Sequence, residues 1–310
     1  MNRSPLALSA PLSLLLTALL AASLSAEEAG EQQGIQKPFL WEIEGQSPSY
    51  LFGTIHITDP RVLALHPAIE EAFDSADAVY TEIAMDMATQ TQAMLGMMLP
   101  GNQRLSQLLP EETQTRLSAE LGRISPGLGL VGPLDRMRPW ALAASLPMLE
   151  AQLKNPGKQA LDAKIFYRAL AREKEAQGLE TVAEQLAIFG GLTMDEQIEM
   201  LEMTLDQIDE ARAKGTNPLE TLTQVYLAGD LDALQKTMEE WSDGESELSQ
   251  RFETALLDKR NRLMAERIDA LLQKPEKRQY FFAVGAAHYY GETGLLRLLQ
   301  EKGYQLRRLP

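Results

Sequence analysis

The chain has 310 residues, a formal net charge of −15 and no cysteine. Nucleic acids and anionic membrane surfaces are bound by basic patches, so this acidic balance argues against both as partners. The absence of cysteine excludes disulfides and a thiol nucleophile, and the length allows one large domain or two small ones, at roughly 100–200 residues per domain.

Residues 1–26 have the form of a secretory signal peptide. Arg3 is followed by an apolar run, Leu12–Leu24, and by small residues typical of a cleavage region. The run is shorter than the about 20 apolar residues that span a membrane; an uncleaved membrane anchor is the alternative. An export signal without disulfides indicates a bacterial periplasmic or secreted protein. Residues 27–37 predict a flexible lead-in, which leaves a single domain over 38–310, with no later membrane span.

The first elements predict a hairpin followed by a β-α-β unit. Phe39–Glu44 alternates apolar and polar residues, as a half-buried strand does. A turn connects it to a second strand, Tyr50–Ile57. Helix Pro67–Ser75 then leads to a third strand, Ala78–Ala84. Two strands joined through a helix in this way normally run parallel.

The middle of the chain predicts a helical insertion over about residues 85–272. Helical sequence divided by Pro and Gly runs from Met85 to about Lys174, and a short strand and turn follow at Gln177–Thr181. Further amphipathic helices end in one long helix, Glu247–Leu272.

A second β-α-β unit closes the chain. It comprises strand Tyr280–Val284, helix Glu292–Lys302 and strand Tyr304–Leu309. The fold class that these elements predict is α/β, with a central mixed β-sheet, β-α-β units at both ends of the chain and the large helical insertion between them.

The same short motif follows an apolar strand near each end. Gly53-Thr-Ile-His56 and Gly285-Ala-Ala-His288 contain two of the three histidines of the chain. Open α/β sheets place ligands at the carboxyl ends of their strands, and glycine lets the backbone turn sharply there. With Glu82 at the end of the third strand, two imidazoles and a carboxylate would suit a divalent transition metal that activates water. The alternative is two strand-end histidines that cap backbone groups.

Arg260 and His66 each allow two interpretations. Arg260 lies on the apolar face of its helix, between Leu257 and Met264. It either extends its charged end to the surface or points into a site and pairs with a carboxylate. His66 has Glu70 four residues on and could form a metal pair with it, but its place at a helix start favours a capping role.

Several motifs occur together in an order typical of one family. They are Leu51-Phe-Gly-Thr-Ile-His56, Tyr80-Thr-Glu82, Gly178-Leu-Glu-Thr181 with Gln185, Arg260-Asn261, and Val284-Gly-Ala-Ala-His288 with Gly291, Gly294-Leu-Leu296 and Gly303-Tyr304. In these motifs the chain resembles the TraB/PrgY/GumN family, which includes the animal Tiki proteins, over about residues 38–310. Each motif alone is unspecific, whereas their combination is specific.

The resemblance implies a fold similar to that of erythromycin esterase and the ChaN haem-binding proteins. It also implies a metal-dependent hydrolase, because Tiki members are described as metalloproteases that use manganese or cobalt. The paired Gly-x-x-His motifs of the family correspond to His56 and His288. Its strand-end glutamate corresponds to Glu82 and its helical arginine to Arg260, which favours the inward orientation of Arg260.

Two functions are consistent with these features. The first is a periplasmic or secreted metal-dependent hydrolase, a Tiki-like peptidase acting on a peptide or protein substrate, with Mn²⁺ or Co²⁺, or alternatively Zn²⁺, held by His56, His288 and Glu82. Glu82 would be the third ligand or the general base, and Arg260 would orient Glu82 or polarise a carbonyl. The second is a non-catalytic protein that binds a peptide, haem or saccharide in a cleft. Met- and Leu-rich helices would also suit a homodimer.

Overall fold

The computed structural model describes residues 34–45, 47–127, 129, 132–241, 250–252 and 254–310. The predicted signal peptide, 1–26, and residues 27–33 of the lead-in lie outside the described residues. None of the described helices is long and apolar enough to cross a membrane.

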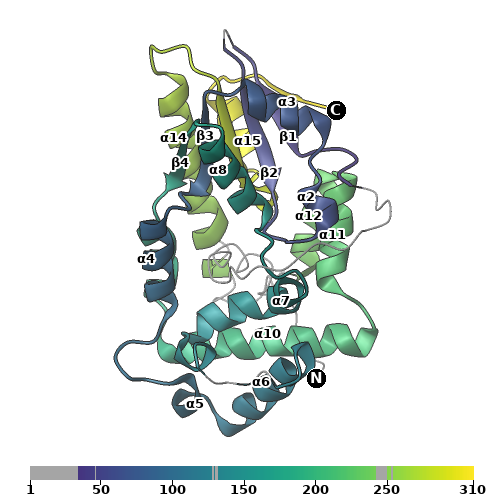
Figure 1. The fold of residues 1–310 in the computed structure, drawn as a ribbon, viewed down its shortest axis with the longest axis vertical. Coiled ribbons are helices and arrows are strands. Elements are labelled where there is room, and N and C mark those ends of the chain that lie inside the picture. Colours follow the sequence, from purple (N-terminus) through teal and green to yellow (C-terminus); the bar gives the residue numbers. More distant parts are fainter. Residues whose placement is uncertain (1–33, 46, 128, 130–131, 242–249, 253) are drawn as a thin grey trace.

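Six strands form one mixed sheet, as predicted. Their order is β4-β3-β5-β2-β1-β6 (Figure 1). The strands are β1 (Leu40–Ile43), β2 (Ser49–Thr54), β3 (Ala78–Ile83), β4 (Glu175–Glu180), β5 (Tyr280–Gly285) and β6 (Leu306–Arg308). Strands β4, β3, β5 and β2 are parallel to one another, and β1 is antiparallel to β2 and to β6. The predicted hairpin is therefore the β1–β2 pair.

The two ends of the chain interleave in this sheet. Strands β2 and β3 run parallel but do not pair, because β5 lies between them. The register pairs Thr54 of β2 with Gly285 of β5, so the two Gly-x-x-His segments leave the sheet side by side. Gly53 is needed for this approach, since a Cβ there would lie 2.7 Å from the Cβ of Phe39 and 3.3 Å from that of Ala286.

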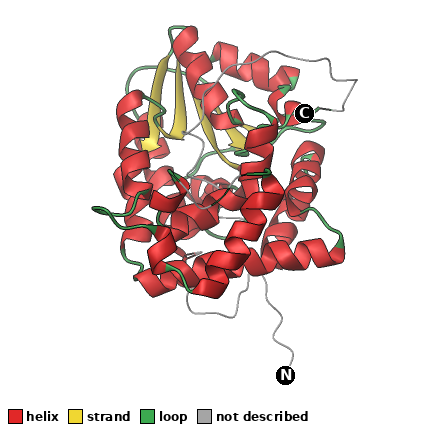
Figure 2. Ribbon diagram, turned by 60° about the horizontal axis from the view of Figure 1, so that its bottom comes forward, coloured by secondary structure: helices red, strands yellow, loops and turns green. Residues whose placement is uncertain are grey.

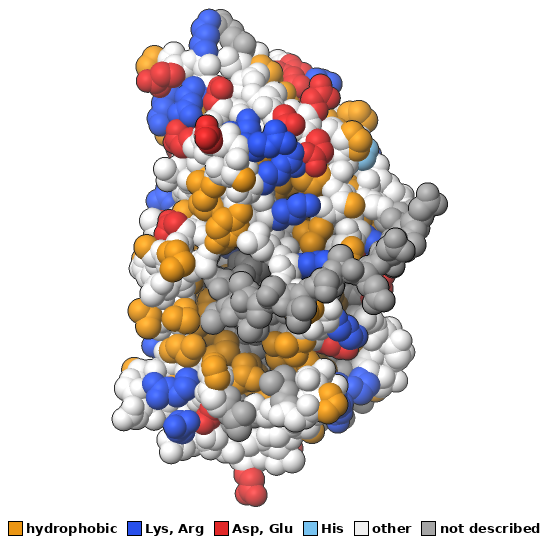
Figure 3. Space-filling view, viewed as in Figure 1, with side chains coloured by type: hydrophobic (Ala, Val, Ile, Leu, Met, Phe, Trp, Pro, Cys, Tyr) orange, Lys and Arg blue, Asp and Glu red, His pale blue; other side chains and the backbone are white. Residues whose placement is uncertain are grey.

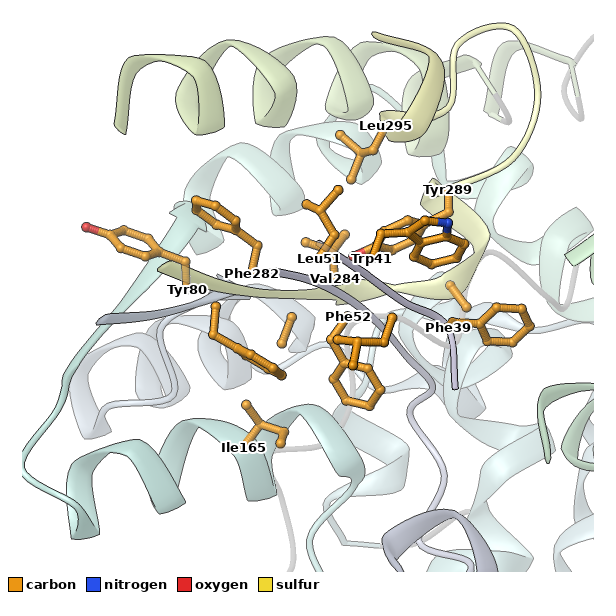
Figure 4. Packing of buried hydrophobic residues seen from close by; sticks show 14 of the residues in the cluster. Phe39, Trp41, Leu51, Phe52, Tyr80, Ile165, Phe282, Val284, Tyr289 and Leu295 are labelled. Carbon is orange, nitrogen blue, oxygen red and sulfur yellow. The ribbon is translucent and has the colours of Figure 1, made fainter. Parts of the chain in front are cut away.

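Helices cover both faces of the sheet. The helices that precede and follow the sheet strands are α2 (Pro60–Leu63), α3 (Pro67–Ser75), α8 (Leu161–Ala171), α14 (Lys259–Leu272) and α15 (Leu295–Glu301). Figure 4 shows Leu295 of α15 packed over one face and Ile165 of α8 over the other, with neighbours Leu51 and Phe52 on opposite sides. Residues of β2, β3 and β5 are almost all buried, as expected of parallel strands covered twice. Burying a side chain such as Phe282 contributes about 1.5–3 kcal/mol.

The helical insertion forms a second layer with its own core, below the sheet in Figure 1. The helices of this layer are α4 (Met87–Met97), α5 (Leu105–Leu108), α6 (Glu111–Ile124), η2 (Leu134–Arg136), α7 (Pro139–Lys154), α9 (Val182–Gly190) and α10 (Met194–Lys214). Helices α11 (Pro218–Ala228) and α12 (Leu231–Trp241) also belong to the insertion but pack against the core of the sheet. Trp140 of α7 stacks on Phe189 of α9 with ring centroids 3.9 Å apart, and Phe252 packs beside them. Figure 2 shows how far the helices extend beyond the strands.

Local capping signals in the sequence hold in the structure. Thr181 with Glu184 and Thr193 with Glu196 each form a capping box, which fixes the starts of α9 and α10. His66 is the N-cap of α3, and its Nδ1 accepts a hydrogen bond from the Ala68 amide at 3.2 Å. The capping interpretation of His66 is thus confirmed.

The long helix predicted over 247–272 is not regular. Residues 242–249 and 253 lie outside the described residues, and a π turn, η3 (Thr254–Asp258), precedes α14. The wider π turn changes the direction in which the side chains of the next helical turn point. Consecutive residues are buried within the π turn, Leu256 with Leu257, and at the start of α14, Arg260 with Asn261.

Hydrophobic and charged side chains gather on different parts of the surface shown in Figure 3. Hydrophobic side chains gather over the region of α4 and α10, and charged side chains of both signs gather over the end of the molecule that contains the sheet. Helix α4 contains no charged residue, and its Met87 and Leu95 are 82% and 65% exposed. Helix α4 therefore presents an apolar outer surface.

Candidate active site

Four parallel strands end at one edge of the sheet, the edge that faces the helical layer. Strand β2 leads to His56 and β5 leads through a short helix, η4 (Ala286–His288), to His288. Strand β3 carries Glu82 one residue before its end, and β4 ends at Glu180. This is the edge where open α/β sheets place ligands.

The carboxylate of Glu82 is buried and held from three sides. Its Oε1 accepts a hydrogen bond from the Gly285 amide at 2.7 Å and lies 3.8 Å from His288 Nε2. Its Oε2 accepts from Arg260 Nη2 at 2.5 Å. Burial alone would raise the pKa of Glu82, but the Arg260 charge, the two histidines and the Gly285 amide lower it to about 2. Glu82 is therefore ionised at neutral pH.

Arg260 points inward and pairs with two carboxylates. Its Nε and Nη2 contact Glu180 Oε1 and Oε2 at 3.1 and 2.7 Å, while Nη2 also donates to Glu82 and Nη1 to the Leu256 carbonyl. Burial would lower the pKa of Arg260, yet Glu82 and Glu180 hold it above its usual value. The sequence left open whether Arg260 extends to the surface or points into a site, and the structure confirms the inward orientation. Gln185 Nε2 completes the cluster by donating to Glu180 Oε2 at 3.2 Å.

His288 is fully buried and held in one tautomer. Its Nδ1 lies 2.6 Å from Asn261 Oδ1, an oxygen that can only accept, so the proton is on Nδ1. Its Nε2 has no hydrogen-bond partner among the described residues. Burial, and then the Arg260 charge, lower the pKa of His288 to about 3. The ring is therefore neutral, with a free lone pair on Nε2.

His56 is held by a residue of the helical insertion. Its Nδ1 lies 2.8 Å from Asp162 Oδ1, near the start of α8. The two atoms are at ion-pair distance but not aligned as a hydrogen bond, and neither His56 nitrogen has a hydrogen-bond partner among the described residues. Burial would lower the pKa of His56, but the Asp162 carboxylate raises it above its ordinary value.

The donor types at this edge suit a divalent metal. Each imidazole faces an oxygen of another element through Nδ1, and its Nε2 is buried without a partner in the described part of the chain, which is the usual setting of a metal-ligating histidine. The 3.8 Å between His288 Nε2 and Glu82 Oε1 is within the roughly 4 Å that two ligand atoms of one ion would have.

His56 is not part of a ready-made ligand group. Among the residues that the structure describes, no three His, Cys, Asp or Glu side chains are placed to hold one ion. The structure thus brings Glu82, Arg260 and His288 into one cluster. His56 lies at the same edge and its charge acts on Glu82, but its own contact is to Asp162.

Four partners at this edge had no role assigned from the sequence: Glu180, Gln185, Asn261 and Asp162. Glu180, Gln185 and Asn261 lie within the motifs that carry the family resemblance, so their positions were visible but their contacts were not. Asp162 has no sequence signal, because it lies on an ordinary amphipathic helix and reaches His56 across 106 positions of the chain. A buried acid in the first turn of a helix gives no sign of its role until its partner is seen.

The protein is thus an α/β protein with two histidines, a carboxylate and a buried arginine at the carboxyl edge of its sheet. The chain matches the TraB/PrgY/gumN family over residues 39–308 and belongs to that family. It is 29% identical to "Metalloprotease TIKI1" of Danio rerio over 311 residues, covering 88% of this chain and 63% of the relative.

Two further relatives are also named metalloproteases. "Metalloprotease TIKI1" of Homo sapiens is 28% identical over 312 residues, with 88% of this chain and 62% of the relative covered. "Metalloprotease TIKI homolog" of Nematostella vectensis is 25% identical over 311 residues, with 86% and 66% covered. The chain therefore spans less than two thirds of the length of these relatives. No solved structure matches it, and the predicted likeness to erythromycin esterase and ChaN proteins stays a prediction.

Proposed function

We propose that this chain is an exported metal-dependent hydrolase that cleaves peptide bonds at the edge formed by His56, Glu82 and His288. The observation that carries the proposal is the pair of buried imidazoles, each with an oxygen at Nδ1 and an Nε2 without a partner among the described residues. The names of the relatives, metalloproteases, support the reaction class. The form of residues 1–26 supports export to the periplasm or medium.

His56 and His288 would hold the metal through Nε2, with Glu82 Oε1 beside them. Mn²⁺ or Co²⁺ is our first choice and Zn²⁺ the alternative, since imidazole and carboxylate ligands suit all three. A bound ion would supply an acidified water and polarise the scissile carbonyl. Neutral His288 is ready to ligate without first losing a proton.

Glu82 and Arg260 would then have distinct roles. A carboxylate with a pKa of about 2 is a weak general base near neutral pH, so Glu82 suits a ligand or a fixed negative charge better than a proton acceptor. All three nitrogens of the Arg260 guanidinium already donate within the protein. Arg260 therefore acts as a positioning residue that fixes Glu82 rather than as a group that contacts the substrate.

The test uses the third histidine as a matched control. We expect His56→Ala and His288→Ala each to lose Mn²⁺ and Co²⁺ binding in calorimetric titration, whereas His66→Ala keeps it. Wild type should cleave an unstructured peptide library, lose activity in chelator and regain it with Mn²⁺. If both site variants remain folded and bind metal with full stoichiometry, the metal site is refuted. Tight peptide binding without any turnover would favour a cleft-binding protein instead.

A further inference from the structure

A cavity of about 50 Å³ lies directly beside the candidate active site. One wall is formed by the two segments that leave the sheet, with Thr54, Ile55 and His56 from one and Gly285, Ala286 and Ala287 from the other. Because His56 is itself part of this wall, any group that enters the cavity brings its attached atoms next to the imidazole.

The opposite wall is apolar and comes from helices of the insertion. Met148 of α7, Leu222 and Tyr226 of α11, and Leu234 and Met238 of α12 line it. The hydroxyl of Tyr226 is already used, since it donates to the Gly53 carbonyl at 2.7 Å. Apart from His56 the described lining thus contains no ionisable group free to meet a charged ligand. Two methionines in the wall let it adjust to irregular apolar shapes.

Two residues of the lining, Thr54 and His56, have side-chain polar atoms without a hydrogen-bond partner among the described residues. The hydroxyl oxygen of Thr54 makes no hydrogen bond within the described chain, although the residue is only 2% exposed. A buried hydroxyl left unpaired is unfavourable, and a ligand that offers an amide group next to an apolar part would satisfy it. The cavity therefore combines an apolar interior with an unpaired hydroxyl close to His56.

The size of the cavity limits what it accepts. A water molecule needs about 10–15 Å³ on this measure, so about 50 Å³ holds a few heavy atoms. That space suits an alanine, valine or leucine side chain and is too small for an aromatic ring. The apolar lining disfavours charged side chains, because desolvating them without a partner is costly.

We propose that this cavity is the subsite for a short aliphatic side chain of a peptide. The backbone amide of the bound residue pairs with the Thr54 hydroxyl, and the neighbouring peptide bond lies at His56. The role of the subsite in cleavage rests on the function proposed above, whereas the binding itself needs neither a metal nor turnover.

Methionine methyl groups provide a direct assay. In the full-length protein labelled with ¹³C at methionine methyls, we expect N-acetyl-leucinamide to shift the resonances of Met148 and Met238 saturably. N-acetyl-phenylalaninamide should not shift them, and exposed Met87 should respond to neither compound. Thr54→Val keeps the shape of the side chain but removes the hydroxyl, and should weaken leucinamide binding about three- to tenfold.

Two variants that change the volume complete the test. Leu234→Phe should fill the cavity and abolish the shifts. Met238→Ala should enlarge it and admit the phenylalanine compound, which keeps the test decisive if Leu234→Phe does not fold. Absent shifts at Met148 and Met238, or equal responses to both compounds in wild type, overturn the proposal. If aliphatic binding is intact but no peptide is cleaved in any metal, the subsite stands and the proposed hydrolase fails.

Discussion

Replacing Arg260 by glutamine should destabilise the folded protein, because it leaves two buried carboxylates, Glu82 and Glu180, without their shared cation. Breaking a buried ion pair by removing one partner costs about 3–5 kcal/mol. The lowered pKa of Glu82 leads to a similar free energy. Its pKa is about 2 in the folded protein and 4.5 ordinarily, and at about 1.4 kcal/mol per pH unit this difference corresponds to about 3 kcal/mol of stability. This is a large share of the roughly 5–15 kcal/mol by which domains are stable.

The pH dependence of this loss has a definite sign. In wild type the pKa of Glu82 is depressed, so its stabilisation is present above about pH 4.5 and is lost as the pH falls towards about 2. In Arg260→Gln, burial without the guanidinium raises the pKa of Glu82 above its ordinary value. As the pH falls, Glu82 of the folded variant takes up a proton, which removes part of the cost of burying its charge. The difference in the free energy of unfolding between wild type and variant should therefore become smaller from pH 8 to pH 5.

Urea unfolding followed by tryptophan fluorescence at several pH values measures both effects. The control is Arg267→Gln, seven residues along the same helix, where the pair with Glu184 is about one third exposed on both sides. An exposed pair of this kind contributes about 1 kcal/mol or less. The reasoning is refuted if the two variants lose the same stability at pH 7, or if the gap of Arg260→Gln to wild type does not change with pH.

Other predictions test the strand approach, the histidine support and the helical core. Gly53→Ala should destabilise by about 1–3 kcal/mol in thermal unfolding, because its Cβ would lie 2.7 Å from Phe39, whereas Gly45→Ala, with nothing within 4 Å, should be near neutral. Asn261→Ala should weaken metal binding 10- to 100-fold in titration, since it removes the partner of the histidine Nδ1; unchanged affinity would argue against ligation by that ring. Trp140→Ala should cost about 3–5 kcal/mol in urea, because the indole is buried and stacked; a loss under 1 kcal/mol would contradict a packed second core.

Local signals explain what the sequence could predict. The hairpin, helix Pro67–Ser75 and its His66 cap follow from turn residues, periodicity and a cap within a few positions of one another. The motifs ending at His56 and His288 showed that two strand ends belong together, because the same pattern occurs twice in a chain with three histidines. Glu82 followed from its place at the end of a predicted strand.

Long-range contacts explain what the sequence left open. Nothing local shows that β5 enters between β2 and β3, since that order depends on pairings across more than 200 positions. The contact of Asp162 with His56 likewise joins helix α8 to the distant segment that follows β2. The π turn before Arg260 was hidden because its apolar spacing resembles that of a regular helix.

The placement of β5 also bears on how the protein is made. Tyr50 pairs with Phe281, so β5 can join the sheet only after the more than 200 residues that separate it from β2 have been made. Until then the early strands β2 and β3 lack the strand that joins them, and two of the site residues, Glu82 and His288, lie on separate parts of the nascent chain. Contacts of such sequence separation form slowly. The topology therefore delays assembly of the edge that holds Glu82 and His288 until β5 has been made.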